Sequence, residues 1–213
     1  MRGVFVTGTD TGVGKTVVSA ALMLRYREAR YWKPIQTGPD DDTAEVQRLS
    51  RCTRDQVYLH GVRLPDPVSP HLAAARAKTR INLQFLTDWV KASADSWIVE
   101  GAGGALVPLN ESDLMIHLIE RLGLPVVVTA RTTLGTINHT LLTLEALRAR
   151  RLTASGVVLV GDPNHDNRAA IERYGNVRIL GEMPRFDSLT PDAVEAWAQS
   201  SLDPKGALGE FLG

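Results

Sequence analysis

The sequence predicts an α/β fold in which a mostly parallel β-sheet carries helices on both faces. Short apolar runs alternate with longer stretches of helical pattern. The runs lack alternating polar residues, which is typical of strands buried on both faces of a parallel sheet. The 213 residues are 44% hydrophobic and 23% charged. This is enough to bury one large core, so we expect a single domain over residues 1–213.

The expected elements follow one another in regular order. Strands are predicted at residues 4–7, 30–32, 97–99, 125–130, 155–160 and 177–180. Helices are predicted between them at residues 15–28, 43–50, 82–94, 114–122, 136–151, 166–174 and 191–199. This alternation predicts right-handed crossovers between parallel strands. Residues 58–79 are rich in proline and are expected to form a long excursion from the sheet, and the residues after Ser200 show little pattern.

Composition and charge narrow the class of protein. The 24 basic residues balance the 24 acidic ones, so nothing indicates a nucleic-acid or anionic-membrane partner. No apolar run approaches the length of a transmembrane helix, and the sequence starts on its first strand without a signal peptide. The single cysteine, Cys52, excludes an internal disulfide and is interpreted as a structural residue. We therefore expect a soluble cytoplasmic protein.

The segment GTDTGVGKT, residues 8–16, is the most informative feature of the chain. It follows the first strand and opens the first helix, which is the layout of a phosphate-binding P-loop. Glycines let backbone N–H groups surround an anion, the helix N-terminus and Lys15 add positive charge, and the Thr16 hydroxyl is placed to hold Mg²⁺. The strict pattern requires glycine at position 9, whereas this chain has Thr9 and carries the glycine at Gly8. An ordinary glycine-rich turn is the alternative, but the strand-to-helix context favours a P-loop.

Polar residues cluster after the second, third and fourth predicted strands. Lys33 lies in KPIQTG, an aspartate triplet ends at Asp42, and Glu100 begins EGAGG. Each has an ordinary alternative: a solvated lysine, a helix N-cap and an exposed acid. The stretch at residues 130–139 contains a predicted helix N-terminus that could bind an anion such as a substrate carboxylate. Ligands bind beyond the carboxyl ends of strands in open parallel sheets, so together these residues predict one site.

The chemistry that this set supports is phosphoryl transfer. Thr16, Asp42 and Glu100 are the candidates for holding the divalent ion of a nucleoside triphosphate. Lys15 and Lys33 would supply positive charge on the two sides of the transferred group, where negative charge is spread over the phosphoryl oxygens.

Taken together, the motifs resemble those of the dethiobiotin synthetases, a family of the deviant P-loop NTPase superfamily. The resemblance rests on GTDTGVGKT, KPIQTG, DDDTAEV, PVSPH, VEGAGG, LGTINHTLLT and GEMP, which occur in this order along nearly the whole chain. It implies a homodimeric ligase of biotin biosynthesis that uses Mg²⁺ and ATP or another nucleoside triphosphate. Its other substrates would be 7,8-diaminononanoate and CO₂. One amine would capture CO₂ as a carbamate, the nucleotide would phosphorylate the carbamate, and the second amine would close the ureido ring of dethiobiotin, leaving ADP and phosphate.

The resemblance also implies roles for individual residues. Lys15 and Lys33 would be catalytic, and Lys33 would offset the charge of the carbamate. The metal ligands would be Thr16, Asp42 and Glu100. The nucleotide would contact Gly12, Val13, Gly14, Lys15, Thr16, Val17, Asp42, Glu100, Gly101, Ala102, Gly103, Pro184, Arg185 and Phe186. The substrate would contact Thr11, Lys33, Thr37, Pro70, Gly135, Thr136, Ile137 and Asn138, with residues 135–138 coming from the other subunit.

One position departs from the family pattern. Family members that prefer ATP tend to carry asparagine at the end of the fifth strand, where it reads the adenine edge, whereas this chain has Val160. A valine forms no such hydrogen bond, so Asp162 or Asn164 would have to substitute. ATP is therefore the default nucleotide, and no base selectivity is predicted.

Two other functions fit the P-loop taken alone. A partition or septum-positioning ATPase of the same superfamily would act through macromolecular partners, but such proteins carry an extra lysine where this chain has Asp10. The balanced charge also argues against DNA or membrane partners. A nucleotide-binding module without catalysis is the other alternative, although such a module would not need both lysines and both acids.

Overall fold

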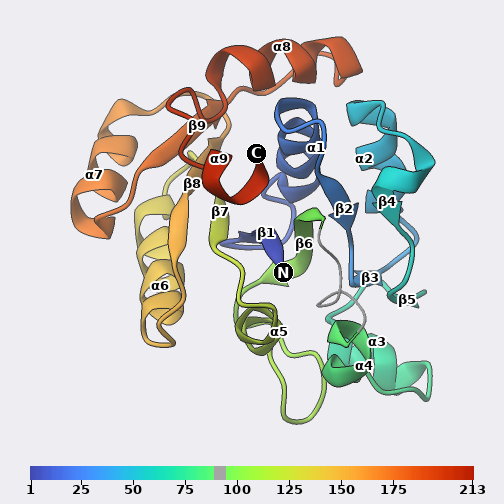
Figure 1. The fold of residues 1–213 in the computed structure, drawn as a ribbon. Coiled ribbons are helices and arrows are strands. Elements are labelled where there is room, and N and C mark those ends of the chain that lie inside the picture. Colours follow the sequence, from blue (N-terminus) through green and yellow to red (C-terminus); the bar gives the residue numbers. More distant parts are fainter. Residues whose placement is uncertain (89–94) are drawn as a thin grey trace.

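The computed structural model describes residues 1–88 and 95–213 and contains the expected sheet (Figure 1). Its seven strands are arranged in the order β4-β2-β6-β1-β7-β8-β9, and every pairing between these strands is parallel. The strands are β1 (Arg2–Gly8), β2 (Arg30–Trp32), β4 (Val57–Tyr58), β6 (Ser96–Gly104), β7 (Val126–Arg131), β8 (Ala154–Val160) and β9 (Ile179–Met183). The prediction of an α/β fold with a mostly parallel sheet is confirmed.

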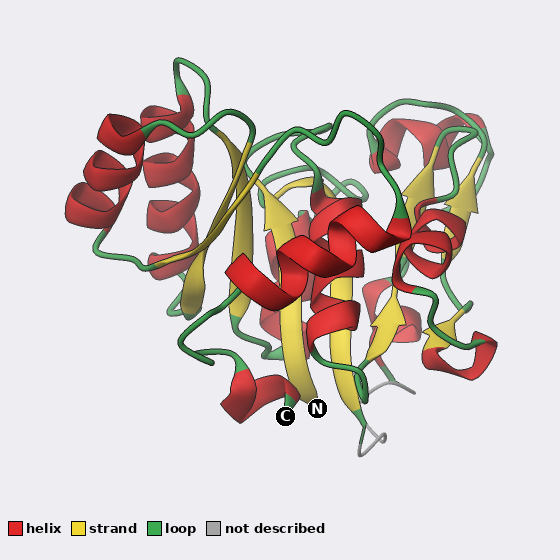
Figure 2. Ribbon diagram, turned by 90° about the horizontal axis from the view of Figure 1, so that it is seen from above, coloured by secondary structure: helices red, strands yellow, loops and turns green. Residues whose placement is uncertain are grey.

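Helices cover both faces of the sheet (Figure 1, Figure 2). On one face, buried side chains such as Leu22 and Val194 form a core beneath α1 (Lys15–Arg25), α2 (Asp42–Ser50), α8 (Pro191–Ser201) and α9 (Gly209–Leu212). On the other face, Leu118 and Leu144 belong to a second core beneath α3 (Pro70–Arg76), α4 (Leu83–Thr87), α5 (Met115–Leu122), α6 (Thr136–Arg148) and α7 (His165–Gly175). Burial from both sides explains why the strand sequences are continuously apolar.

Three short strands were not predicted from the sequence. Strands β3 (Ile35–Thr37) and β5 (Val62–Leu64) form a separate two-stranded parallel sheet, and β4 adds an edge to the main sheet. The proline-rich excursion therefore has regular structure, since it contains β5 and α3. Strands of two or three residues are too short to show a periodic pattern, which is why the sequence did not reveal them.

Several element boundaries differ from those predicted. Strand β6 continues to Gly104, so EGAGG belongs to the strand instead of following it. Helix α1 ends at Arg25 because the chain turns there to bury Ala29 and enter β2. Helix α4 covers only Leu83–Thr87 of the helix predicted at residues 82–94, and positions 89–94 of that prediction lie outside the described residues.

The C-terminal residues, which showed little pattern, are packed against the protein. Leu202, Leu208 and Leu212 are buried in the core beneath α1. None of the helices in residues 1–88 and 95–213 is long and apolar enough to span a membrane.

The parallel topology decides where the polar segments meet. Strand β1 pairs with β6 and β7, and β2 pairs with β6, so the carboxyl ends of these four strands lie along one edge of the sheet. The P-loop leaves β1 at this edge, Lys33 follows β2, and Glu100 lies within β6. The site is therefore assembled from segments that are distant in sequence.

Candidate active site

The loop between β1 and α1 has the backbone of a P-loop. Gly12 and Gly14 have φ angles of +70° and +93°, in the left-handed region that favours glycine. Gly14 caps helix α1, and a Cβ there would lie 3.2 Å from the Cγ1 atom of Val160. The loop therefore curls tightly against the end of β8. The Lys15 ammonium donates a hydrogen bond of 3.0 Å to the carbonyl oxygen of Asp10, which closes the curl.

Lys15 lies beside a second lysine in a poorly hydrated position. Its side chain is buried, and burial followed by repulsion from Lys33 lowers the pKa of Lys15 to about 8, against the opposing attraction of Glu100, Asp42 and Asp10. An anionic ligand between the two lysines would favour their charged forms. The site is thus electrostatically suited to phosphate.

Glu100 is the centre of a buried polar cluster. It is 0% exposed, and its Oε1 atom accepts hydrogen bonds from the Thr16 hydroxyl at 3.0 Å and from the Lys33 ammonium at 2.7 Å. Its Oε2 atom accepts a hydrogen bond of 2.9 Å from the Tyr31 hydroxyl. Lys33 also lies 2.6 Å from Oδ2 of Asp42 and donates to the Gly101 carbonyl at 3.2 Å. The Lys33 ammonium group therefore bridges Glu100 and Asp42, the two acids that were predicted from the sequence to be metal ligands.

Charge compensation decides the protonation of this cluster. Burial acts to lower the pKa of Lys33, but the carboxylates of Glu100 and Asp42 outweigh it, so the pKa of Lys33 is raised. Burial, together with the charge of Glu100, raises the pKa of Tyr31 well above its usual value. Lys33 therefore remains an ammonium and Tyr31 a neutral phenol that can only donate to Glu100.

A cavity of about 390 Å³ joins the P-loop to this cluster. It is lined by most of the predicted site residues together with Ile35, Gln36 and Asp40, which were not predicted. The predicted residues that line it are Thr11, Gly12, Gly14, Lys15, Thr16, Val17, Lys33, Thr37, Asp42, Glu100, Ala102 and Gly103. Val13 is buried with its side chain directed at Gly8, and Gly101 contacts the cluster only through its carbonyl.

The predicted base-binding residues lie at the ends of β8 and β9. Pro184 and Arg185 are exposed directly after β9, and Phe186 is half-buried against the core beneath α1. The side chain of Val160 faces Gly14. The Asn164 side-chain oxygen accepts a hydrogen bond of 2.9 Å from the backbone N–H of Asn167 and so caps α7. This contact occupies one of the two acceptor positions of the Asn164 oxygen.

A second cavity, also of about 390 Å³, lies on the other side of Asp10 and Thr11. It is lined by the ends of β1 and β6 and by the α6 residues His139, Leu142 and Thr143. None of the predicted residues Pro70, Gly135, Thr136, Ile137 and Asn138 lines either of these two cavities.

The predicted carboxylate-binding turn forms the start of α6. Gly135 caps the helix with a φ of +93°, and the Thr136 hydroxyl donates a hydrogen bond of 2.5 Å to the Arg131 carbonyl. Leu134, directly before the turn, is fully exposed, whereas Pro70 is buried at the start of α3. Within one chain, this turn is thus separate from the phosphate cavity.

Sequence reasoning missed two contacts of the site. One is the Tyr31 hydroxyl on Glu100; a two-residue period along β2 would have placed Tyr31 on the same face as Lys33. The other is an ion pair of 2.9 Å between Arg131 and Asp10, which balances the acid within the P-loop. That pair forms because β1 and β7 are neighbours in the sheet, and the sequence alone does not reveal which strands are neighbours.

The donor set fits Mg²⁺ that arrives with phosphate. Thr16, Glu100 and Asp42 offer oxygen atoms, which hard cations prefer. The described part of the chain contains no group of three or more His, Cys, Asp or Glu side chains that could hold a metal ion. Magnesium commonly binds through one or two carboxylates plus substrate phosphates, and these residues match that pattern.

Comparison with known proteins gives consistent matches. A family described as AAA domain matches residues 2–193. The ATP-dependent dethiobiotin synthetase BioD of Paramagnetospirillum magneticum is 55% identical over 89% of this chain and 91% of its own length. The protein of the same name from Nitrobacter hamburgensis is 46% identical over 98% of this chain and 96% of its own length. The biotin biosynthesis bifunctional protein BioCD of Bordetella avium is 49% identical over 93% of this chain, which spans only 43% of that longer protein.

Solved structures resemble the fold at low sequence identity. A ParA family ATPase from Chlorobium tepidum has a TM-score of 0.59 and 14% identity, covering 93% of this chain and 98% of that chain. The cell division ATPase MinD of Pyrococcus furiosus has a TM-score of 0.55 and 17% identity, covering 98% and 96%. At such identities the likeness extends to the fold and not to function.

Proposed function

This chain belongs to the family of ATP-dependent dethiobiotin synthetases, and we propose that it carboxylates 7,8-diaminononanoate and closes the ureido ring at the expense of a nucleoside triphosphate. The observation that carries this proposal is the placement of Lys15 and Lys33 in one cavity that Thr16, Glu100 and Asp42 also line. One lysine is part of the phosphate-binding loop and the other follows the neighbouring strand. Two separate lysine ammonium groups suit a reaction in which a phosphoryl group passes from a donor to an anionic acceptor.

The proposed reaction balances in three steps. An amine of the substrate attacks CO₂, forms a C–N bond and releases a proton, which gives a carbamate. A carbamate oxygen then attacks the terminal phosphorus of ATP and breaks its bond to the bridging oxygen, which releases ADP. Finally the second amine attacks the carbonyl carbon and expels phosphate as it loses its proton, which closes the cyclic urea.

The chain's own residues would supply binding and charge. The P-loop amides and Lys15 would hold the phosphates and stabilise negative charge on the transferred group. Lys33 would attract the carbamate, with Thr11 and Thr37 as hydrogen-bonding residues on the same cavity wall. The second cavity adjoins Thr11 and has apolar walls such as Leu142, which suits the alkyl chain of the substrate.

Thr16, Asp42 and Glu100 would hold Mg²⁺, which supplies charge neutralisation for the phosphate oxygens when bound. Because Lys33 lies between both acids, its ammonium compensates them when no such ion is present.

An assay of nucleotide hydrolysis tests this function. We expect release of ADP and phosphate that requires both the diamine and bicarbonate, with dethiobiotin as the product. Lys33→Ala should lose turnover while it still binds nucleotide, because Lys33 acts on the acceptor. Hydrolysis stimulated by DNA or vesicles, and not by the diamine, would instead favour the partition or septum-positioning ATPases that share the fold.

We further propose a homodimer in which the start of α6 completes the partner's substrate site. Leu134 and Leu142 are exposed apolar side chains of this region, and the N–H groups of the turn at Gly135 could receive a carboxylate. The test mixes two inactive variants, Lys15→Ala and Gly135→Phe. If the sites are shared, heterodimers regain one working site. The absence of recovery after verified subunit exchange would show that each subunit works alone. Because the reaction consumes a nucleoside triphosphate, the compartment we propose is the cytoplasm.

A further inference from the structure

The two oxygens of the Glu100 carboxylate have different surroundings. Oε1 is bound by Thr16 and Lys33, which both line the phosphate cavity. Oε2 is bound by Tyr31, which is completely buried and does not line that cavity. The carboxylate therefore presents one oxygen to the ligand and keeps the other inside the protein.

The pairing of strands puts Tyr31 in this place. Tyr31 lies opposite Ile98 in the parallel pair of β2 and β6. Side chains alternate along a strand, so Tyr31 and Lys33 share a face with Ile98 and Glu100. The tyrosine ring belongs to the core beneath α1. Its ring accounts for the packing, whereas its hydroxyl makes one polar contact at the site, the hydrogen bond to Glu100.

A buried carboxylate without this donor would have freedom to turn. The terminal torsion of glutamate has broad minima, so hydrogen bonds must fix its rotation. If Oε2 had no donor, a buried acceptor would be left without a partner, and rotation of the group toward Lys33 would relieve the loss. Such a rotation would take Oε1 away from the Thr16 hydroxyl.

We propose that Tyr31 is a positioning residue that fixes Glu100 so that Oε1 faces Thr16 and the cavity for Mg²⁺ and nucleotide. The inference rests on the proposed function in one respect, namely that a magnesium–nucleotide complex binds in this cavity. It assigns no chemical step to Tyr31, which acts only through Glu100.

The test is Tyr31→Phe, which keeps the ring and removes the hydroxyl. A fluorescent ATP analogue is held at constant concentration, and Mg²⁺ is titrated at equilibrium without diamine or bicarbonate. Loss of a residue that orients a metal ligand typically weakens metal affinity by 10- to 100-fold. We expect the Mg²⁺ concentration for half-maximal binding to rise by about 10-fold or more. Binding of the analogue without Mg²⁺ should change by less than about twofold, because the P-loop amides are untouched.

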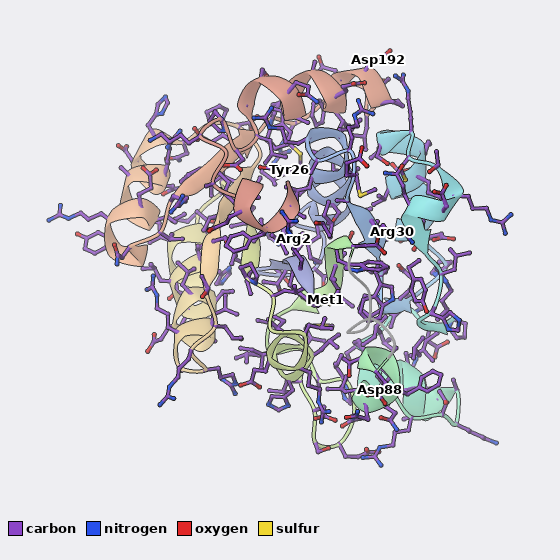
Figure 3. The ribbon with its side chains drawn as sticks, viewed as in Figure 1. Met1, Arg2, Tyr26, Arg30, Asp88 and Asp192 are labelled. Carbon is purple, nitrogen blue, oxygen red and sulfur yellow. The ribbon has the colours of Figure 1, made fainter. Side chains whose placement is uncertain are left out.

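Tyr26→Phe is the matched control. The Tyr26 hydroxyl donates a hydrogen bond of 2.6 Å to Oδ2 of Asp203, so this variant also removes one tyrosine–carboxylate contact. Tyr26 caps the far end of α1 (labelled in Figure 3), 11 helical residues from the P-loop or about 16 Å away. Both variants should lower thermal stability, but only Tyr31→Phe should change the Mg²⁺ requirement.

A second pair of variants separates positioning from packing. In a Glu100→Gln background there is no carboxylate to orient, so adding Tyr31→Phe should change the Mg²⁺ requirement by less than about twofold. An equal Mg²⁺ requirement for Tyr31→Phe and Tyr26→Phe would overturn the proposal, and so would an undiminished effect of Tyr31→Phe in the Glu100→Gln background. Because no diamine is present, a failure of the proposed ligase reaction would not alter these results.

Discussion

Replacing Lys33 by methionine should destabilise the protein by about 3–5 kcal/mol, the usual cost of removing one partner from a buried ion pair. Methionine keeps much of the side-chain volume and removes the ammonium that contacts Glu100 at 2.7 Å and Asp42 at 2.6 Å. Glu100 is fully buried, and its remaining donors, Thr16 and Tyr31, are neutral hydroxyls. Its charge would therefore lose its cation in a medium that solvates charge poorly. Asp42 adds little to the loss, because its side chain is 27% exposed and water can replace the lysine.

Thermal unfolding without nucleotide or Mg²⁺ measures this effect. For a chain of this length, 1 kcal/mol corresponds to about 2–4 °C, so the midpoint should fall by about 6–20 °C. Lys205→Met is the matched control, because Lys205 is exposed and surface substitutions usually change stability by no more than about 0.5 kcal/mol. The double variant Lys33→Met with Glu100→Gln should be more stable than Lys33→Met alone, since it removes both charges.

Addition of Mg²⁺ extends the same test. Another cation near Glu100 and Asp42 would compensate them in place of the ammonium, so Mg²⁺ should raise the midpoint of Lys33→Met more than that of the wild type. A chelator that removes Mg²⁺ should abolish this additional rise in the melting midpoint of Lys33→Met. If the midpoint of Lys33→Met stays within about 2 °C of the wild type, a shift worth about 1 kcal/mol or less, Lys33 does not compensate Glu100 and the reasoning is refuted.

Three further predictions concern catalysis, nucleotide choice and assembly. Lys15→Ala should lower turnover by about 100- to 1000-fold, as expected for loss of one charge-stabilising contact; turnover within a few-fold of the wild type would contradict the P-loop assignment. ATP, CTP and GTP should differ in apparent affinity by about tenfold or less in competition binding, because Val160 cannot hydrogen-bond a base. A preference for ATP of several hundredfold would mean that another group reads adenine. If the protein forms the proposed homodimer, Leu142→Asp should shift it to monomer in sedimentation, because it buries a charge in the proposed interface, whereas Glu145→Asp, an exposed position of the same helix, should not.

The gathering of polar side chains at one edge of the sheet was predictable because sequence motifs and parallel topology agree. Lys33 and Asp42 come after one predicted strand, and Glu100 follows another strand that lies much later in the sequence. Parallel strands bring their carboxyl ends together, so a shared site followed without knowledge of strand order. The positions of these three side chains around one cavity fulfil that expectation.

The contacts that were missed depend on register and on very short elements. The bond between Tyr31 and Glu100 exists because Tyr31 pairs with Ile98, and nothing in the sequence fixes the pairing of β2 with β6 to a single residue. The sheet of β3 and β5 consists of three-residue strands, which carry no measurable period. Of the buried tail leucines, Leu212 belongs to a helix of four residues and Leu208 caps that helix, which is too short to show an amphipathic pattern.

The charges of the site explain why the same residues can serve both the free and the ligand-bound protein. Lys15 and Lys33 carry two positive charges, and Glu100 and Asp42 carry two negative ones, so these four groups balance one another. Lys33 is held by both acids and is therefore not available to an acceptor unless another cation compensates them. Under the proposed function, the requirement for Mg²⁺ would then have two physical origins: neutralisation of the phosphates and release of Lys33 toward the carbamate. The Lys33→Met melting experiment isolates the second origin, because it measures compensation of the acids without any nucleotide present.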